Sequence, residues 1–258
     1  MTAIVVIPAR YGATRFPGKL LADLHGKPLI QHAWERAREL ASVSRVLVAT
    51  DDERISRAVL GFGGEVVMTR VDHPSGTDRV GEVARALSAE LIVNLQGDEP
   101  LIDTKAVDEL VRTMSREPGI VMGTLAHAIN QEGELASPHV VKVVVDQEGF
   151  ALYFSRAPVP FARSRGKHPP LRHIGLYVYR RDFLLTLTSL PPSPPELTEG
   201  LEQLRALEHG YRIKVLLSPT PSFGVDTPED LIRLRELLAK GSRSPEHPGP
   251  GHLRTVNG

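Results

Sequence analysis

The sequence contains no cysteine among its 258 residues. This absence excludes disulfide bonds, thiolate chemistry and zinc sites with cysteine ligands, and it fits a reducing compartment. An excess of either charge is also missing, since Lys+Arg and Asp+Glu both number 31. A chain without a basic bias gives no indication of a nucleic acid or an anionic membrane surface as partner.

Long apolar runs are missing as well. No run reaches the roughly 18 residues that a membrane-spanning helix needs. The N-terminus enters a strand-like run at once, without the basic region, apolar region and cleavage site of a secretory signal. We therefore expect a cytoplasmic protein with no membrane partner and no nucleic acid partner, long enough to bury a sizeable core.

The first strand-like run leads into a loop that carries three cations. Residues 4–7 are apolar and uncharged, which is typical of a strand buried on both faces. The loop that follows contains Arg10, Arg15 and Lys19. These side chains, together with glycine backbone N–H groups, suit a polyphosphate, and open α/β sheets bind ligands at the carboxyl ends of their strands. The alternative interpretation is a solvated basic loop on the surface.

This loop is not a Walker A motif. Five residues separate Gly12 from Gly18, one more than that motif has, and Leu20 follows Lys19 where the motif has serine or threonine. The hydroxyl group that binds magnesium is therefore missing. If the loop holds a nucleotide, the metal ligands must be carboxylates elsewhere in the chain.

Strand-like runs alternate with amphipathic helical patterns, which predicts an α/β fold with a mostly parallel, mixed sheet. Strands are predicted at 4–7, 45–50, 65–68, 91–95 and 213–217. Helices are predicted at 28–40, after a capping Asp51, at 79–88, from 103 or 104 to 115, at 194–209 and from 227 to 240.

The middle of the chain has a different pattern. Residues 140–146 and 149–154 predict a β-hairpin, and residues 171–179 predict a further strand. We interpret residues 1–240 as a single domain with a β-rich insertion over about 120–190. The tail, 241–258, is rich in Pro, Gly, Ser and His and is predicted to be disordered.

Two carboxylates stand where strands end. Asp98 follows a predicted buried strand, and Asp226 follows a strand and a Pro-rich turn. Mg²⁺ prefers oxygen ligands, often one or two carboxylates plus substrate phosphates. Taken alone, Asp98 could be a turn former and Asp226 could support the helix that follows it. Together with the lysine-bearing loop, they favour metal-assisted phosphoryl chemistry.

A second polar group lies on the predicted insertion. Arg156, Arg172 and His173 are cationic or polar, and Tyr177 lies four residues after His173, so that both side chains point to one face of a strand. This set would suit an anionic, hydroxyl-rich partner such as an acid sugar. Ordinary surface or interface residues are the alternative interpretation.

Two further sets have structural explanations of their own. Glu199, Glu202 and Gln203 have the i, i+3, i+4 spacing of one helix face, for which solvation is the default. Ser75 and Gly76 read as a turn, although they could offer small donors to a base or a ribose.

Eight segments, in this order and spacing, resemble the 3-deoxy-manno-octulosonate cytidylyltransferase (CMP-KDO synthetase) family. They are IPARYGATRFPGK, MTRVDHPSGTDR, IVNLQGDEP, VKVVVD, ALYFSRAPVP, LRHIGLYVY, LEQLRALEHG and GVDTPEDL, and they extend to about residue 240. The resemblance implies a nucleotide-diphospho-sugar transferase fold of the glycosyltransferase-A type. It also implies the reaction CTP + KDO → CMP-KDO + diphosphate for lipopolysaccharide biosynthesis, with Mg²⁺, in a cytoplasmic homodimer built largely through the β-rich insertion.

The resemblance also assigns roles to individual residues. It implies that Arg10, Arg15 and Lys19 bind the CTP phosphates, that Ser75 and Gly76 lie near the cytidine, that Asp98 and Asp226 hold Mg²⁺, and that Gln96, Arg156, His173, Tyr177, Glu202 and Gln203 bind KDO. Family members commonly have serine where this chain has Ala13, which leaves Thr14 as the hydroxyl of that loop. The alternatives are a cytidylyltransferase for another acid sugar, of the sialic acid type, and a catalytically silent nucleotide-binding module.

Overall fold

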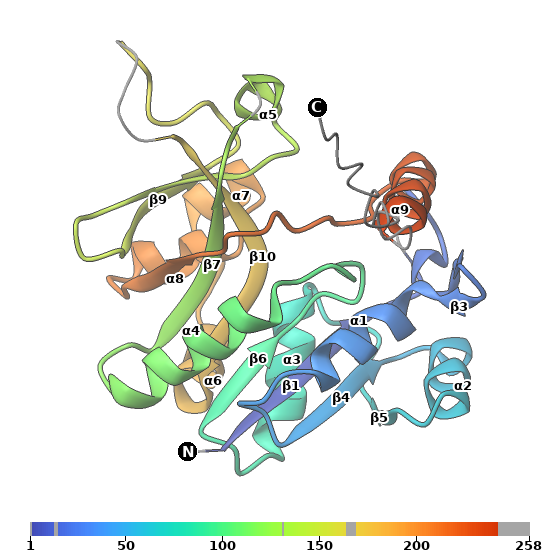
Figure 1. Ribbon diagram of the computed structural model, residues 1–258. Helices are drawn as coiled ribbons and strands as arrows, with labels where there is room; N and C mark the ends of the chain where they lie inside the picture. The colour runs from blue at the N-terminus through green and yellow to red at the C-terminus, as the bar shows by residue number, and fades with distance from the viewer. Residues whose placement is uncertain (1, 13–14, 131, 164–168, 242–258) are drawn as a thin grey trace, which may run out of the picture.

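The fold is organised around one mixed sheet. The computed structural model describes residues 2–12, 15–130, 132–163 and 169–241. Seven strands cross the sheet in the order β11-β7-β10-β6-β1-β4-β5. Their bounds are β1 Ala3–Ala9, β4 Arg45–Thr50, β5 Glu65–Met68, β6 Leu91–Asn94, β7 Met122–Ala128, β10 Leu171–Arg180 and β11 Ile213–Leu217. Of these seven, β10 alone is antiparallel to its neighbours, which confirms the predicted, mostly parallel α/β fold (Figure 1).

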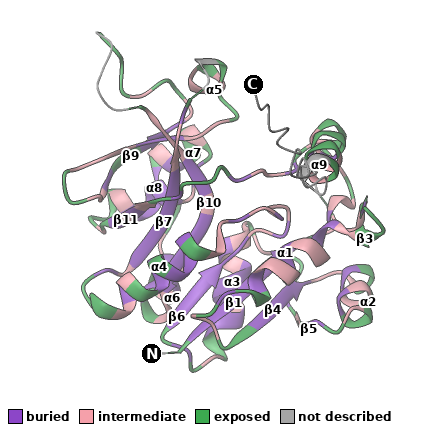
Figure 2. Cartoon of the chain, in the orientation of Figure 1, coloured by how far each residue is buried: buried purple, intermediate pink, exposed green. Residues whose placement is uncertain are grey.

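Strand β1 is buried on both faces, as its sequence predicts. Val5 and Ile7 belong to one core, and Ile4 and Val6 belong to the other. The first core is covered by α1 (Leu29–Arg38), α2 (Glu53–Gly61) and α4 (Thr104–Arg116). The second is covered by α3 (Gly76–Arg85), α6 (Arg181–Leu187) and α8 (Gln203–Glu208). Figure 2 shows the buried residues concentrated in the central strands and on the helix faces turned toward them.

The β-rich region contains the predicted hairpin and one strand that was not predicted. Strands β8 (Lys142–Val145) and β9 (Ala151–Ser155) pair antiparallel, and β8 also pairs with β10. The unpredicted strand is β7, whose MGTLAHA sequence lacks the β-branched run of the other strands. Its glycine is needed for packing, because a Cβ on Gly123 would lie 2.7 Å from the Leu110 side chain of α4.

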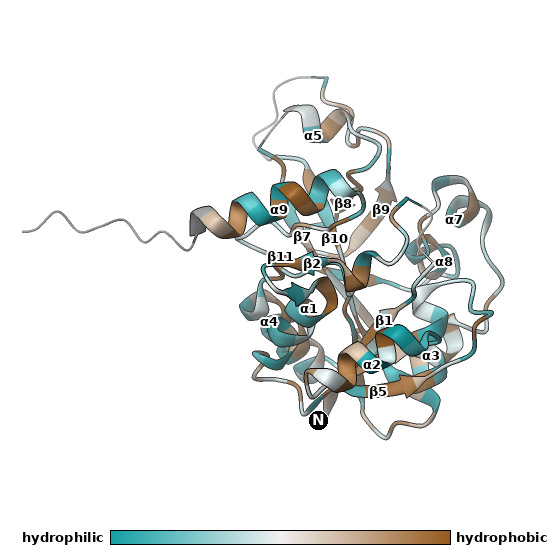
Figure 3. Ribbon diagram, turned by 90° about the vertical axis from the view of Figure 1, so that its right-hand side faces the viewer, coloured by the Kyte–Doolittle hydropathy of each residue, from teal (hydrophilic) through white to brown (hydrophobic). Residues whose placement is uncertain are grey.

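The remaining elements are short, apart from the last helix. They are the 3₁₀ turn η1 (Lys19–Leu21), β2 (Asp23–Leu24), β3 (Lys27–Pro28), α5 (Glu132–Ala136), α7 (Pro194–Glu199) and α9 (Pro228–Gly241). Leu231 and Leu234 of α9 share a small core with Leu24 and Leu29, and apolar and polar residues alternate along α9 in Figure 3. Helix α9 includes Gly241, so the rest of the predicted tail, 242–258, lies outside the described residues. Within the described ranges, no helix has the length and apolar character needed to span a membrane.

Helix starts follow the capping side chains. The predicted cap Asp103 of α4 is confirmed. Helix α2 is capped by Asp52 and not by Asp51, because Asp51 lies against Arg79 instead, at 3.3 Å. Helix α3 begins at Gly76, before the predicted start at 79, because the Ser75 hydroxyl accepts a hydrogen bond from the Asp78 N–H.

The helix predicted over 194–209 is two helices. Its capping box, formed by Ser193 and Glu196, is confirmed. Gly200 has φ +63°, a left-handed conformation that ends α7, and α8 starts at Gln203. The prediction that Glu199 shares a helix face with Gln203 is therefore wrong, since the two residues lie on separate helices.

Candidate active site

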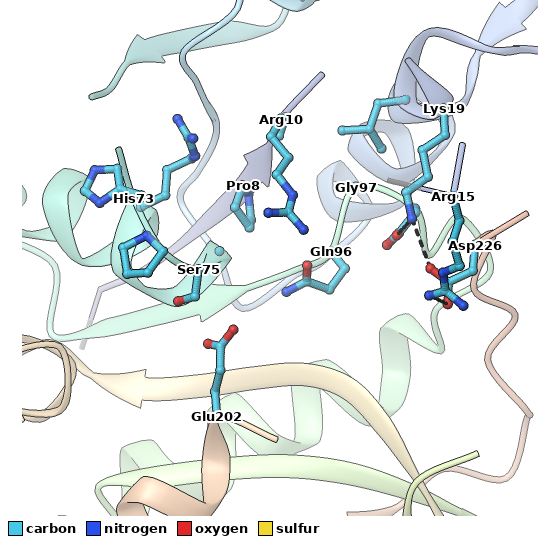
Figure 4. A pocket seen from close by; sticks show the side chains of 16 residues that line it. Pro8, Arg10, Arg15, Lys19, His73, Ser75, Gln96, Gly97, Glu202 and Asp226 are labelled. Carbon is cyan, nitrogen blue, oxygen red and sulfur yellow. Dashed lines mark hydrogen bonds and ion pairs between the residues drawn. The ribbon is translucent and has the colours of Figure 1, made fainter. Parts of the chain in front are cut away.

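A cleft of about 390 Å³ opens at the carboxyl ends of β1 and β6. Nine of the predicted site residues line it, and they come from five separate segments. These are Arg10, Arg15, Lys19, Ser75, Gly76, Gln96, Asp98, Glu202 and Asp226. Figure 4 shows Lys19, Arg15 and Asp226 together on one side of the cleft, Arg10 near Gln96 in the middle, and Glu202 reaching toward Ser75 on the other side. Thr14, the remaining predicted phosphate ligand, lies outside the described residues.

Lys19 is the centre of the charged side. Its Nζ donates to Asp98 Oδ2 in a short hydrogen bond, to Asp226 Oδ1 at 3.2 Å and to the Val225 carbonyl at 2.9 Å. Arg15 also pairs with Asp226, at 3.1 Å. Burial, the largest single effect, lowers the pKa of Lys19, but the charges and hydrogen bonds of the two aspartates together raise it above its ordinary value. The ammonium therefore stays charged at neutral pH.

Gly18 gives the chain the turn that places Lys19. Its φ is +69°, and its N–H donates to the Tyr11 carbonyl at 3.0 Å. A Cβ on Gly18 would lie 3.0 Å from the Tyr11 ring, so both the backbone conformation and the close approach require glycine. The Arg54 guanidinium stacks on the Tyr11 ring, 3.3 Å from its centroid.

The carboxylates of Asp98 and Asp226 meet at Lys19. One oxygen of Asp98 and one of Asp226 both contact the same cationic atom, Lys19 Nζ, which shows that they converge on one position. Carboxylate oxygens are the donors that Mg²⁺ prefers, and substrate phosphates and water usually complete its coordination. Among the residues described, no group of three or more His, Cys, Asp or Glu side chains could hold a metal ion.

Glu202 forms the opposite wall. Burial raises its pKa, against the lowering effect of hydrogen bonds from Thr77 and Ser75. Ser75 is the N-cap of α3, so the helix N-terminus faces the cleft, where its N–H groups favour an anion or an acceptor atom. Gly76 permits this approach, since a Cβ there would lie 3.3 Å from Pro8.

Two polar residues that line the cleft were not predicted from the sequence as site residues. Arg79 is 4% exposed and donates to the Thr69 hydroxyl, and His73 bonds to Glu82. Both line the cleft. Arg79 had a detectable signal, because it is an arginine within the apolar stripe of an amphipathic helix. His73 had none, since a single histidine in a turn carries no pattern.

Comparison with known proteins places these features in a family. The sequence model of the cytidylyltransferase family matches residues 4–213. The 3-deoxy-manno-octulosonate cytidylyltransferase of Geobacter sulfurreducens is 51% identical over 249 residues, covering 92% of this chain and 100% of the relative. That of Solibacter usitatus is 54% identical over 234 residues, covering 90% and 93%. The chain belongs to the 3-deoxy-manno-octulosonate cytidylyltransferase family.

A solved structure extends the comparison with this family to three dimensions. A CMP:2-keto-3-deoxy-manno-octonic acid synthetase, solved in complex with CTP, superposes with a TM-score of 0.89 at 48% identity. The match covers 93% of this chain and 100% of the solved chain. The agreement over the whole length means that the sheet and the segments around the cleft share one architecture.

The remaining predicted residues lie outside the cleft lining. His173 and Tyr177 do point to one side of β10, as predicted, with ring centroids 5.4 Å apart. His173 is 9% exposed, and its Nε2 bonds to the Thr124 hydroxyl at 2.9 Å. Burial lowers the pKa of His173 to about 3, so its ring is neutral, and burial likewise raises the pKa of Tyr177.

Arg156 and Gln203 do not line the cleft either. The Arg156 guanidinium donates to the carbonyls of Glu199, Pro138 and Gly200, at 2.7, 3.0 and 3.4 Å. Gln203 is 4% exposed, and its Nε2 has no hydrogen-bond partner in the described structure. The structure thus gathers the phosphate and metal candidates in the cleft, whereas these four acceptor candidates do not line it.

Proposed function

We propose that this chain transfers the cytidylyl group of CTP to KDO, giving CMP-KDO and diphosphate. The observation that carries the proposal is the arrangement around Lys19, in which a lysine, two arginines and two convergent carboxylates line one cleft at a sheet edge. The names of the relatives and the CTP bound to the structural neighbour support CTP as donor and KDO as acceptor.

The basic loop would hold the triphosphate. Arg10, Arg15 and Lys19 approach from one side of the cleft, where their charges oppose those of the β- and γ-phosphates and of the departing diphosphate. Thr14 would add a hydroxyl to the same loop. Ser75 and Gly76, at the N-terminus of α3, would lie beside the cytidine.

Asp98 and Asp226 would hold Mg²⁺, which neutralises phosphate charge and lowers the pKa of a coordinated hydroxyl when it is bound. Because Lys19 contacts both carboxylates, it also fixes their separation. From this position between Asp98 and Asp226, the Lys19 ammonium can also pair with the phosphates.

The acceptor would enter from the side of Glu202 and Gln96. Gln96 donates to Asn94 at 3.3 Å, which orients its amide at the end of β6. We place Arg156, His173, Tyr177 and Gln203 on this acceptor side too, as the residues that shape the wall behind it.

The reaction is an in-line displacement at the α-phosphorus of CTP. The anomeric hydroxyl oxygen of KDO attacks this phosphorus, and the bond from the phosphorus to the bridging oxygen breaks. Diphosphate leaves, and the hydroxyl proton passes to water.

The test is diphosphate release with Mg²⁺, each of the four nucleoside triphosphates, and KDO or N-acetylneuraminate as acceptor. Release with CTP and KDO alone is the expected result. Release with a different pair would keep the chemistry and reassign the substrate. Tight CTP binding without release in any combination would overturn the proposal in favour of a silent nucleotide-binding module.

A homodimer in the cytoplasm is part of the proposal. Three apolar side chains of the β-rich region are exposed, Leu152 to 61%, Tyr153 to 40% and Phe161 to 87%, and a second copy would cover them. A cytoplasmic location agrees with the lack of cysteine and with the supply of CTP there. Light scattering on the purified protein tests the dimer, and a monomer at micromolar concentration would contradict it.

A further inference from the structure

Lys142, the first residue of β8, is a lysine with no exposed surface. Its Nζ donates to three main-chain carbonyls, those of Ser137 at 2.9 Å, Val140 at 2.6 Å and Arg156 at a shorter distance. Burying an ammonium is costly unless every donor is hydrogen-bonded, and here three carbonyls supply the partners. Lys142 thus fastens the 137–140 segment to the residue that follows β9.

Glu199, the last residue of α7, connects this helix to the end of β9. Its carboxylate accepts from the Ser155 hydroxyl at 2.6 Å and from the Arg156 N–H at 2.9 Å. The Arg156 side chain in turn donates to the Glu199 and Gly200 carbonyls. These are carbonyls at the end of a helix, which lack intrahelical partners and attract a cation.

This network ends two residues before the cleft wall. Gly200 makes the left-handed turn between α7 and α8, and Glu202 lines the cleft beside Ser75. A buried ion pair between Glu196 and Arg205, at 2.5 Å, holds the turn from within the protein. The contacts of Lys142, Arg156 and Glu199 hold it from the β8–β9 hairpin.

We propose that Lys142 and Glu199 are positioning residues for the acceptor, because they fix the turn that places Glu202 and Gln203 relative to the cleft. The inference rests on the proposed function, since it concerns the sugar side of the same site. It predicts a selective defect: acceptor binding weakens, whereas CTP, which is held by the loop around Lys19 on the other side, binds as before.

Glu199→Gln is the main test, because it keeps the size of the side chain. The substitution removes the negative charge that strengthens both hydrogen bonds and replaces one acceptor oxygen by an NH₂ donor. We expect the KM for KDO to rise by about tenfold, as the loss of one buried hydrogen bond to a charged group predicts. The KM for CTP should change by less than about twofold on the same energy scale.

The matched control is Glu208→Gln, an exposed glutamate at the end of α8, which should leave both KM values unchanged. An unchanged KM for KDO in Glu199→Gln, or an equal rise in both KM values, would overturn the proposal. A general loss of structure would lower the thermal midpoint and affect both substrates.

Lys142→Met tests the other end of the network. Its control is Lys214→Met, because Lys214 also donates to a main-chain carbonyl, that of Glu148 at 2.5 Å, but on the exposed side of the hairpin. If Lys142→Met folds, its defect and that of Glu199→Gln should combine less than additively in the double variant. Full additivity would show that the two residues act separately.

The two proposals fail in different ways. If the wild-type protein does not release diphosphate from CTP and KDO, the proposed function is wrong. If the wild-type protein is active and Glu199→Gln has wild-type kinetics for KDO, the positioning role is wrong and the function stands.

Discussion

Lys19 joins segments that are far apart in the sequence. Its partners Asp98 and Asp226 lie 79 and 207 residues away along the chain. An ammonium that contacts both carboxylates balances part of their charge and brings them together. The three side chains therefore act as one unit, and the loss of any of them should disturb the other two.

We expect Lys19→Met, Asp98→Asn and Asp226→Asn each to lower turnover by at least about 10², the usual effect of removing a preorganised charge. Initial rates of diphosphate release at saturating substrates measure this. Lys27→Met is the control, because Lys27 is also ion-paired, with Glu35 at 2.8 Å, but outside the cleft. A near-wild-type rate in Asp226→Asn would show that this residue is not a ligand of the proposed Mg²⁺.

His173 should make the stability of the protein depend on pH. Burial lowers its pKa from 6.5 to about 3 in the folded chain, so the unfolded chain takes up a proton more readily. The contribution of the neutral ring to the free energy of unfolding is fully present above pH 6.5 and is lost as the pH falls toward 3. When the pH is about two units below the ordinary pKa of histidine, the free energy of unfolding is lowered by at most about 3 kcal/mol.

Urea unfolding of wild type and His173→Gln at neutral pH and near pH 4.5 tests this prediction. The variant should lose less stability on acidification than the wild type, whatever its stability at neutral pH. His139→Gln, at an exposed histidine, should behave like the wild type. Equal losses in wild type and His173→Gln would show that His173 is not the source of the acid sensitivity.

At the level of elements, backbone conformation decides which side chains reach the cleft. Gly18 starts η1 and directs Lys19 toward the sheet edge, whereas Gly200 separates α7 from α8 and sets Glu202 at the wall. Both glycines have positive φ, a region that side-chain-bearing residues occupy at a cost. Glycine at these two turns is thus a requirement of the site.

Gly18→Ala should weaken CTP binding. The left-handed conformation costs about 1–2 kcal/mol with a Cβ, and the new methyl group would press on the Tyr11 ring. We expect the Kd for CTP to rise by up to about tenfold in titration calorimetry, which corresponds to that strain. Gly119→Ala, where a Cβ meets nothing within 4 Å and φ is not positive, is the control. An unchanged Kd would show that the loop tolerates the residue.

At the level of the whole molecule, α9 closes the structure beside the first loop. Its Leu231 and Leu234 pack in the small core with Leu29 at the start of α1, and the helix begins two residues after Asp226. The end of the described chain therefore fixes one of the two metal-ligand candidates. Stability of this small core and the geometry of the cleft should change together.

Leu234→Ala should destabilise the fold by about 2–5 kcal/mol, because this fully buried side chain would leave a cavity. Leu237→Ala, on the same helix but 47% exposed, should cost less than about 1 kcal/mol. Urea denaturation measures both. Equal effects of the two substitutions would mean that α9 is not packed through Leu234.

The sequence by itself determined most of the elements and the basic loop that lines the cleft. An uncharged apolar run at residues 4–7 can only be satisfied by burial on both faces, and a capping box or a capping Asp103 specifies a helix start locally. Arg10, Arg15 and Lys19 were recognisable for the same reason, since a basic loop after a buried strand is a local pattern.

Tertiary structure alone decided the contacts made across the sheet. No local signal shows that Lys19 touches both aspartates or that the helical pattern over 194–209 divides at Gly200. Strand β7 likewise depends on packing against α4, since its own residues favour a strand only weakly. The buried charge of Lys142 and the buried neutral ring of His173 have hydrogen-bond partners from other segments, carbonyls in the first case and a hydroxyl in the second, and long-range packing brings those partners together.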